Sequence, residues 1–563
     1  INPAVEAPTI LRMFVERGQI RAELEIERGS LYAFRNLLPD PIYKELAEDL
    51  GFEDREPAER LQRFFERDLI LRTGEGPPLV GRVQEVRWGK KTLRDLLSTE
   101  PLPVDKQKGP AAVHATLVWP LESEPTTLSI RPPSRVQTRR SPLTRIGFRL
   151  YHLEVPVADY RMLGQTEQVD LDWKDPWFSR FRNPEFFRFN RDLLQVFLYI
   201  EALEVRAEVV FRPRDLQEFV DLGLADRERI PVELQKSIRE KLESFLPRHL
   251  HLSIDGKEEH PSLASLNFLQ LRIGNTEILD GVGETRTADT FLGAVFIVSR
   301  MGWPQDVGLT WDLYPSRAPL ATATAVDLEN GFPVQLSKDS PKLSWTNHLE
   351  DPPVPAFLHV PAPPAPARID LPIPSLVLGL VGVGALLVLW RKRRVAGVLA
   401  ALASLLLAFL LRSTITVPVR DPFARPVTIG DAEASLVLEA TLANLYHAYD
   451  RREETLVYDG LARTVDGPLL QNLYLQMRKS LELANQGGVL AKVDQVRLDS
   501  ASIRPLDPGS GFDALCRWQI SGSVGHWGHV HRRNNAYEAR LRLEDLGGSW
   551  KITALDVKSE ERL

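Results

Sequence analysis

Three histidines near the C-terminus are the residues whose type and spacing most directly suggest chemistry. His526, His529 and His531 fall within one six-residue stretch. Imidazole is the commonest protein ligand for zinc, copper and nickel, so this spacing suggests a metal site. On a regular strand His529 and His531 share one face and His526 lies on the other. All three converge only if Gly525 or Gly528 forms a bulge or a turn.

Further metal ligands are available elsewhere in the same region. His447 lies on an expected helix and Glu538 on the strand after the histidines. The predicted site contains His526, His529, His531 and His447, and it would hold copper, zinc or nickel. An ordinary structural explanation stays open, in which these imidazoles bond to the backbone or to carboxylates, and the sequence requires no cofactor.

An enzyme is the second alternative for the C-terminal region. A histidine would act as general base, a carboxylate would orient it, and a tyrosine hydroxyl would donate a proton. The candidates are His529, His531, Asp450, Asp459, Tyr446 and Tyr458. The chain contains no Gly-x-Ser-x-Gly, no His-Glu-x-x-His and no phosphate-binding or dinucleotide loop, so no catalytic residue is assigned.

An aromatic and arginine-rich segment, residues 172–190, is the third candidate. Aromatic residues and arginine dominate the binding energy of protein interfaces, which favours a partner-binding surface. The alternative is an aromatic core on which arginines stack. The predicted partner-binding residues are Trp173, Trp177, Phe178, Phe181, Phe186 and Phe187.

Composition restricts the class of protein. A length of 563 residues predicts about three folded units. Hydrophobic residues at 43% and charged residues at 26% are typical of globular chains. A net charge of −6 gives no basic field for nucleic acid. The single cysteine excludes a disulfide framework and a multi-cysteine metal site.

Two uncharged stretches, residues 371–390 and 395–411, predict a transmembrane helical hairpin. Between them lies the cationic tip 391–394, which the positive-inside rule places in the cytoplasm. Both flanking regions would then lie in the periplasm of a bacterium, with the bilayer as one partner. The chain begins at Ile1 without a Met or an apolar leader, which fits cleavage of a signal peptide.

The region before these stretches is self-similar at a spacing of about 180–185 residues, which suggests a duplicated domain. Residues 20–34 resemble 205–219, including an Arg-Ala-Glu triplet, and 64–76 resemble 245–257. Each copy alternates as strands do. The predicted fold is multidomain α+β, with these parts: β-rich copy 1, 1–150; connector, 151–200; copy 2, 201–350; Pro-rich linker, 351–370; transmembrane hairpin, 371–411; C-terminal domain, 420–563.

The C-terminal region begins with helical periodicity and continues with strands. Asp431 is the expected N-cap of the first helix. Four strand-like stretches follow, ending with Ser-Trp-Lys-Ile-Thr-Ala-Leu-Asp-Val at 549–557. This order resembles the NTF2-like (SnoaL-like) cone superfamily, and the resemblance implies helices wrapped by a curved sheet. The chain as a whole resembles uncharacterised bacterial membrane-anchored periplasmic proteins.

The sequence therefore favours a membrane-anchored periplasmic scaffold or accessory subunit that binds other membrane or periplasmic proteins. A metallochaperone that uses the histidines is the alternative, and an enzyme with a pocket in the cone is the third. Nucleic acid is not an expected partner.

Overall fold

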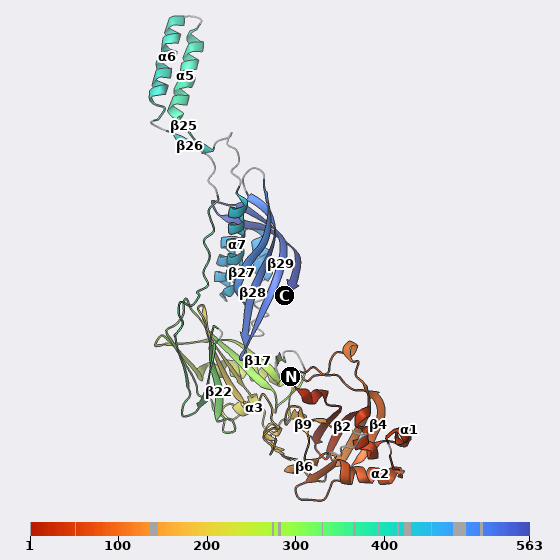
Figure 1. Cartoon of the computed structure of the whole chain (residues 1–563). Helices are drawn as coiled ribbons and strands as arrows, with labels where there is room; N and C mark the ends of the chain where they lie inside the picture. The colour runs from red at the N-terminus through yellow and green to blue at the C-terminus, as the bar shows by residue number, and fades with distance from the viewer. Residues whose placement is uncertain are drawn as a thin grey trace. The chain divides into compact units, whose positions relative to one another are not determined.

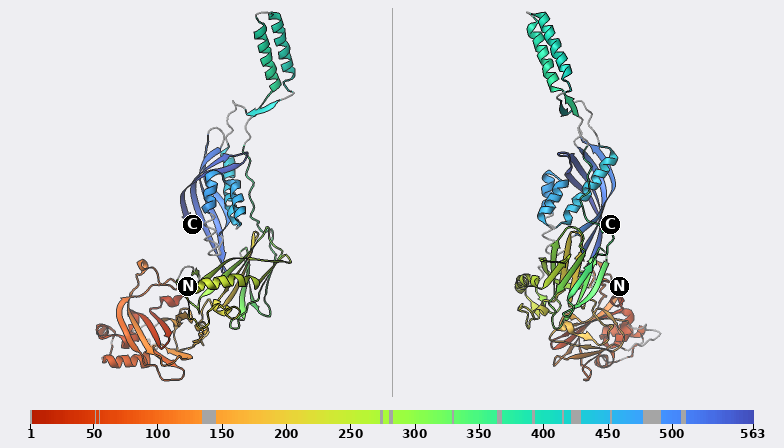
Figure 2. Two further views of the ribbon diagram at one scale, coloured as in Figure 1. Left: turned by 180° about the vertical axis from the view of Figure 1, so that it is seen from behind. Right: turned by 90° about the vertical axis from the view of Figure 1, so that its left-hand side faces the viewer.

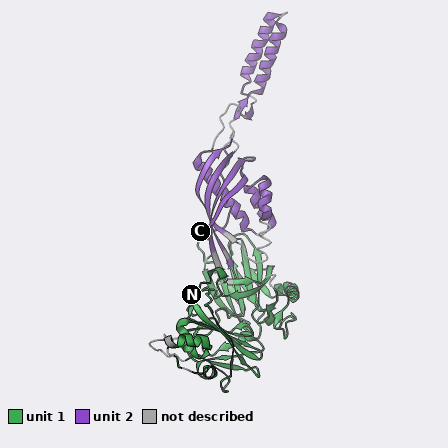
Figure 3. Ribbon diagram, turned by 90° about the vertical axis from the view of Figure 1, so that its right-hand side faces the viewer, with its two compact units in different colours: residues 1–352, 485–488, 526–528 green, residues 353–484, 489–525, 529–563 purple. Residues whose placement is uncertain are grey.

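The computed structural model describes the chain except residues 1, 51, 54, 134–144, 273–274, 280–282, 329, 364–367, 391–392, 414–415, 421–428, 452, 477–490 and 507–510. Ile1, where signal-peptide cleavage is expected, lies outside the described residues. The chain divides into two compact units (Figure 3). The first contains residues 1–352 and the turn His526–Gly528, and the second contains most of the remaining chain.

The first half of the first unit is built on a sheet with the strand order β4-β5-β2-β1-β7-β8, and β9 also pairs with β7. Figure 1 labels β2, β4 and β9 of this sheet. On β2, Ile20, Ala22 and Leu24 alternate with Arg21 and Glu23, so one face of the strand is buried and the other polar. The strands are β1 Thr9–Glu16, β2 Gln19–Glu27, β4 Arg82–Lys90, β5 Ala111–Pro120, β7 Ile146–His152, β8 Val155–Pro156 and β9 Arg161–Leu163.

A smaller sheet of order β11-β10-β6-β3 and several helices complete this half. Residues of both sheets and of the helices share one apolar core, to which Leu24, Leu46 and Phe148 belong. The elements are η1 Pro3–Glu6, η2 Arg28–Leu37, α1 Asp40–Leu50, α2 Pro57–Arg63, η3 Phe64–Asp68, η4 Val104–Lys106, β3 Ile70–Thr73, β6 Thr127–Arg131, β10 Glu167–Asp170, η5 Pro176–Phe178 and β11 Arg180–Phe181.

The second half of the unit repeats this arrangement of strands. Its large sheet has the order β18-β17-β20-β13-β12-β22-β23. Strand β12 pairs antiparallel with β13 and parallel with β22, just as β1 pairs with β2 and β7. The strands are β12 Leu194–Ile200, β13 Glu204–Phe211, β17 Ser262–Arg272, β18 Asn275–Ile278, β20 Phe291–Ser299, β22 Leu320–Asp327 and β23 Asn330–Ser337.

A second small sheet, of order β16-β15-β21-β24, and the helix α4 pack against this core. Ile238 and Leu242 lie one turn apart on α4 and are fully buried, as expected of the apolar face of a surface helix. The elements are α3 Pro213–Leu216, β14 Arg229–Ile230, α4 Val232–Phe245, η6 Leu246–Arg248, β15 Leu250–Ile254, β16 Lys257–Glu259, β19 Thr285–Arg286, β21 Asp306–Trp311 and β24 Lys342–Thr346.

The turn at Trp527 and Gly528 belongs to the first unit. Both residues have positive φ, 46° and 79°, as a two-residue hairpin turn requires. The Trp527 indole is buried in an apolar cluster with Phe197 and Phe291. The Trp527 N–H donates to Glu208 Oε2 at 2.6 Å, and the Gly528 N–H donates to the Tyr199 hydroxyl at 2.9 Å.

Two apolar helices follow the linker, α5 Ile373–Leu389 and α6 Arg394–Leu410. They lie side by side (Figure 2), and the Ser404 hydroxyl donates to the Leu378 carbonyl at 2.5 Å. Each contains 17 residues, a length of about 26 Å against the roughly 30 Å of a bilayer core.

The predicted transmembrane hairpin at 371–390 and 395–411 is therefore wrong, and so is the inner-membrane, periplasmic location that depended on it. Among the residues that the structure describes, no helix has both the length and the apolarity needed to cross a membrane. The uncharged stretch was longer than the helix because Leu371 belongs to strand β25 and Pro372 is the N-cap. The predicted fold class, multidomain α+β with a transmembrane hairpin, also needs correction, since the described part of the chain is strand-rich, with 42% strand against 27% helix.

The C-terminal part of the second unit consists of helices followed by a four-stranded antiparallel sheet of order β27-β28-β29-β30. The helices pack against one face of this sheet (Figures 1 and 2). Helix α7 starts at Asp431, but Gly430 is its N-cap and no side chain caps it, so the predicted cap is wrong. The elements are β25 Arg368–Leu371, β26 Val417–Arg420, α7 Asp431–His447, η7 Ala448–Asp450, α8 Glu454–Thr464, β27 Ala491–Pro505, β28 Gly511–His526, β29 His529–Asp545 and β30 Trp550–Arg562.

Candidate functional site

The aromatic and arginine-rich segment folds through hydrogen bonds that its own aspartates accept. Asp172 Oδ1 accepts the N–H groups of Lys174 and Asp175 at 3.0 and 2.9 Å. Asp175 is the N-cap of the short helix η5, where Oδ1 accepts the Trp177 N–H at 3.2 Å. Short acidic side chains favour such turns because they satisfy backbone donors locally.

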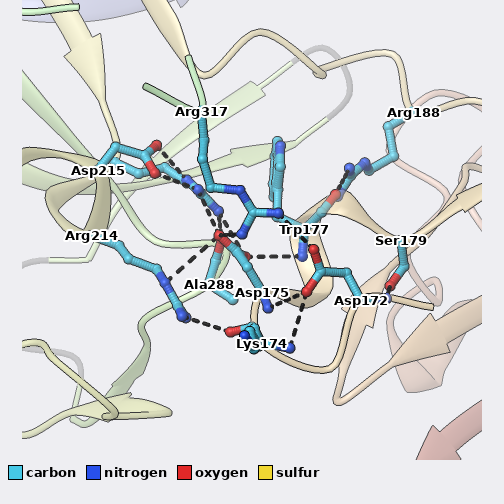
Figure 4. Close-up of polar contacts among 11 residues, drawn as sticks. Asp172, Lys174, Asp175, Trp177, Ser179, Arg188, Arg214, Asp215, Ala288 and Arg317 are labelled. Carbon is cyan, nitrogen blue, oxygen red and sulfur yellow. Dashed lines mark hydrogen bonds and ion pairs between the residues drawn. The ribbon is translucent and has the colours of Figure 1, made fainter. Parts of the chain in front are cut away.

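Arg212, a buried arginine directly after β13, joins this segment to the second half of the unit. Figure 4 labels its partners Asp175, Asp215 and Ala288. The Arg212 guanidinium donates to both carboxylate oxygens of Asp175 at 3.2 and 2.9 Å, to both of Asp215 at 2.8 and 2.6 Å, and to the Ala288 carbonyl at 2.9 Å. Burial lowers the pKa of Arg212, but the two carboxylates outweigh it and the net pKa is raised. The pair of bidentate contacts fixes the geometry of this junction.

A second layer of arginines covers this junction. Arg317 Nη2 lies 2.6 Å from Asp172 Oδ2, and its guanidinium stacks on the Phe178 ring at 3.9 Å. Burial raises the pKa of Asp172. Hydrogen bonds from the Asp175 N–H and from Arg317 lower it by more than burial raises it, so the net pKa is lowered. Arg214 donates to the Lys174 carbonyl at 2.6 Å. The arrangement is an ion-pair network that holds the connector, with every carboxylate already engaged.

Three of the six predicted partner-binding aromatic residues are buried, and two more, Trp173 and Phe178, are half-buried. Trp177, Phe181 and Phe186 are buried, the Trp173 indole N–H donates to the Pro125 carbonyl at 2.7 Å, and Phe178 packs under Arg317. Phe187 differs, since it is 42% exposed. The prediction that these residues bind a partner therefore depends on Phe187, and it stays a prediction.

The sequence analysis missed an exposed aromatic residue two positions further on. Phe189 is 68% exposed, while Arg188 between the two phenylalanines points inward to the Trp177 ring at 3.9 Å. An extended chain sends alternate side chains to opposite sides, so the Phe-Arg-Phe order at 187–189 contained this signal.

Phe189 lines an open, largely apolar groove of about 430 Å³. Leu97, which is 61% exposed, lies along the same groove with Met162. Arg161 forms part of the wall, and its guanidinium stacks on Phe187 at 4.5 Å. The groove therefore combines exposed apolar surface with one cationic group.

Of the four histidines of the predicted metal site, the structure describes the side chain of His447 only. The backbones of His526 and His529 end β28 and begin β29, but the side chains of His526, His529 and His531 lie outside the described part of the structure. His447 Nδ1 lies 2.9 Å from Asp450 Oδ2. Among the described side chains no cluster of three or more potential ligands occurs, and the metal site stays a prediction.

The residues of the enzymatic alternative are distributed over the second unit. Asp450 is buried against His447. The Tyr446 hydroxyl accepts from the Trp518 indole at 3.3 Å, and burial raises the Tyr446 pKa well above its usual range. Tyr458 is 45% exposed and packs edge to face with Tyr474. These contacts give each side chain a structural role.

Comparisons with known proteins give little information about this chain. No family model matches it, and no curated protein matches it. Among solved structures, one match is the intermembrane space region of chloroplast protein ARC6, at 15% sequence identity, covering 23% of this chain and 99% of that one, with a TM-score of 0.19. A similarity at that TM-score supports no conclusion about fold or function.

Proposed function

We propose that the chain is an accessory or scaffold protein that binds a partner protein through the groove beside Phe187 and Phe189. The observation that carries the proposal is the exposure of these two aromatic side chains, 42% and 68%, together with Leu97 at 61%. Exposed aromatic residues around a groove are typical of the central contacts of protein interfaces.

The chemistry of the groove suggests what the partner presents. Arg161 donates to the backbone carbonyls of Glu185 and Tyr160 at 2.8 and 3.0 Å, and to that of Phe187 at 3.4 Å. No carboxylate within 4.0 Å pairs with Arg161 among the described residues. A partner segment with an apolar side chain beside an Asp or Glu would fill the groove and neutralise this charge.

Native mass spectrometry of the full-length protein, isolated from its own cells, tests the proposal. We expect one stoichiometric partner subunit in the spectrum of the unmodified protein. The double variant Phe187→Ala/Phe189→Ala is expected to lose that subunit, because truncating interface aromatics commonly weakens binding by about 2 kcal/mol each.

Phe332→Ala is the matched control, since Phe332 is also exposed, at 48%, but lies on β23. It should retain the partner, and so should His529→Ala/His531→Ala. A spectrum without a partner, or one in which the double variant retains it, contradicts the proposal. Loss of the partner only in the histidine variant would favour the metal alternative.

A further inference from the structure

A second cavity in the first unit, of about 360 Å³, is lined mainly by polar groups. Four arginines line it, Arg149, Arg188, Arg272 and Arg286, and so do four carboxylates, Glu100, Glu154, Asp159 and Asp289, together with the aromatic rings of Trp177 and Phe291. Its volume lies within the range of about 300–1,000 Å³ that is usual for sites that bind small molecules.

Two of these arginines are already paired with carboxylates. Arg286 donates to both oxygens of Asp289 at 2.9 and 2.6 Å. Arg272 lies 2.7 Å from a Glu100 oxygen and 2.9 Å from a Glu277 oxygen. These pairs are self-contained and leave no need for a ligand.

The direct hydrogen-bond and stacking partners of Arg188 among the described residues are all neutral. It donates to the Trp177 carbonyl (Figure 4), and to the Pro156 carbonyl at 3.3 Å. Its guanidinium stacks on the Trp177 ring at 3.9 Å. Burial and the nearby Arg212 charge lower the Arg188 pKa, the charges of Asp159, Asp289 and Asp175 partly offset this, and the net pKa is about 10, so the group remains cationic at neutral pH.

Arg149 likewise forms no direct ion pair with a carboxylate among the described residues. Its Nη1 donates to the Thr99 hydroxyl at 3.4 Å, its guanidinium lies 5.2 Å from the Tyr151 ring, and its buried Nε has no partner. No carboxylate lies within 4.0 Å of Arg149 or Arg188 in the described part of the chain. Asp159 also lines the cavity, and its Oδ2 accepts the Phe189 N–H at 2.7 Å. A half-buried charge that forms no direct ion pair is only partly compensated by more distant carboxylates.

We propose that this cavity binds a small organic oxyanion, a carboxylate or a phosphate ester, with Arg149 and Arg188 as its counterions. Guanidinium groups suit both chemistries because their N–H donors match a pair of oxyanion oxygens. Trp177 and Phe291 pack edge to face, with ring centroids 5.2 Å apart, and offer an apolar wall to the body of the ligand.

Isothermal titration of the full-length protein with three probes tests the assignment. Succinate represents carboxylates, inorganic phosphate represents phosphates, and succinamide is the uncharged counterpart of succinate. We expect succinate or phosphate to bind at concentrations below about 10 mM and succinamide to bind at least about tenfold more weakly. The anion that binds more tightly identifies the ligand class.

Two variants and a control locate the binding. Arg188→Gln and Arg149→Gln should each weaken anion binding at least about tenfold, as expected for the loss of a charge-assisted contact. Arg182→Gln is the control, because Arg182 is exposed and pairs with Asp170. If Arg188→Gln does not fold, as judged by circular dichroism, Arg149→Gln decides the question.

Absence of anion binding up to about 10 mM overturns the proposal. So does succinamide binding as tightly as succinate, or binding that survives both arginine variants. This proposal is independent of the partner groove, because Phe187→Ala/Phe189→Ala should leave anion binding unchanged.

Discussion

The two large sheets of the first unit carry the same Arg-Ala-Glu triplet on corresponding strands but bury it to different extents. Arg21 lies opposite Phe14 and stacks on it at 4.1 Å, and Arg206 lies opposite Tyr199 and stacks on it at 4.4 Å. The Arg21 side chain is 28% exposed, whereas that of Arg206 is 3% exposed.

The difference arises from what lies above each sheet. In the second half, the turn at Trp527 covers the motif, since Glu208 and Tyr199 accept its N–H groups. In the first half, Glu23, which corresponds to Glu208, is 30% exposed. The same local motif is therefore a surface ion pair in one sheet and a buried one in the other, and ion pairs of these two kinds differ widely in energy.

The charged residues at the ends of β13 and β2 also differ in burial. Replacing the one after β13 is expected to have the largest effect on stability. Arg212 follows β13 and lies between two buried aspartates, whereas Glu27 at the end of β2 pairs with Lys91 at 2.7 Å and is 29% exposed. Arg212→Met should destabilise the first unit by about 5 kcal/mol, because Asp175 and Asp215 lose their counterion.

Glu27→Gln should cost less, about 2 kcal/mol, because Glu27 is 29% exposed and the buried Lys91 still donates to the Glu6 and Ala7 carbonyls. Urea denaturation followed by hydrogen exchange of β2 and β13 measures both variants. Equal losses for the two would refute the role given to burial.

The triplets themselves provide the next test. Arg206→Met removes the cation 3.2 Å from Glu208 and 3.9 Å from Glu204, and a loss of about 4 kcal/mol is expected because both carboxylates are buried. Arg21→Met should cost less than about 1 kcal/mol. The same denaturation experiment compares them, and a costly Arg21→Met would mean that the exposed motif is more important than its exposure suggests.

A pH dependence should distinguish the ends of β7 and β22. His152 is buried, with Nδ1 2.7 Å from the Ser179 hydroxyl, and burial lowers its pKa from 6.5 to about 4. Asp327, at the corresponding place on β22, accepts the Trp345 indole N–H at 2.7 Å. Below about pH 6.5 the unfolded chain binds a proton at His152, whereas the folded chain does not. The folded state therefore keeps its full stability with respect to His152 above that pH.

About 3 kcal/mol of the free energy of unfolding is lost through protonation of His152 as the pH falls from about 6.5 to about 4. Thermal unfolding of the protein across this range should show a steep decline that His152→Gln flattens. His251→Gln, at a half-exposed position, is the control and should leave the profile unchanged. A profile that stays the same in His152→Gln would contradict the assignment.

A smaller effect than that of replacing Arg212, Arg206 or His152 is expected at a glycine under the Trp527 ring. A Cβ on Gly293 would lie 2.2 Å from Trp527 Cη2 and 2.6 Å from Leu269 Cδ1, so Gly293→Ala should cost about 2 kcal/mol by overpacking. His114 occupies the corresponding position on β5, and its Nε2 lies 2.9 Å from the Lys90 carbonyl oxygen. His114→Ala should be nearly neutral in thermal unfolding, and a neutral Gly293→Ala would show that the turn is loosely packed.

Several elements could be predicted from the sequence because their patterns are local. The alternation around Arg21 and Arg206 indicated strands, observed as β2 and β13. In the C-terminal region, the four predicted strands are observed as β27 to β30 and the first helix as α7. The length of an apolar helix was less predictable, because Pro372 shortened α5 from the uncharged stretch that suggested a membrane span.

The candidate site was only partly predictable for a similar reason. The sequence by itself determined that residues 172–190 are rich in aromatics and arginine, that Asp175 can cap a turn, and that the Phe-Arg-Phe order alternates. Only the tertiary structure decided that Arg212 is buried between two aspartates while Phe189 is exposed. Burial and charge pairing depend on segments distant in sequence, and no local pattern specifies which of them will meet.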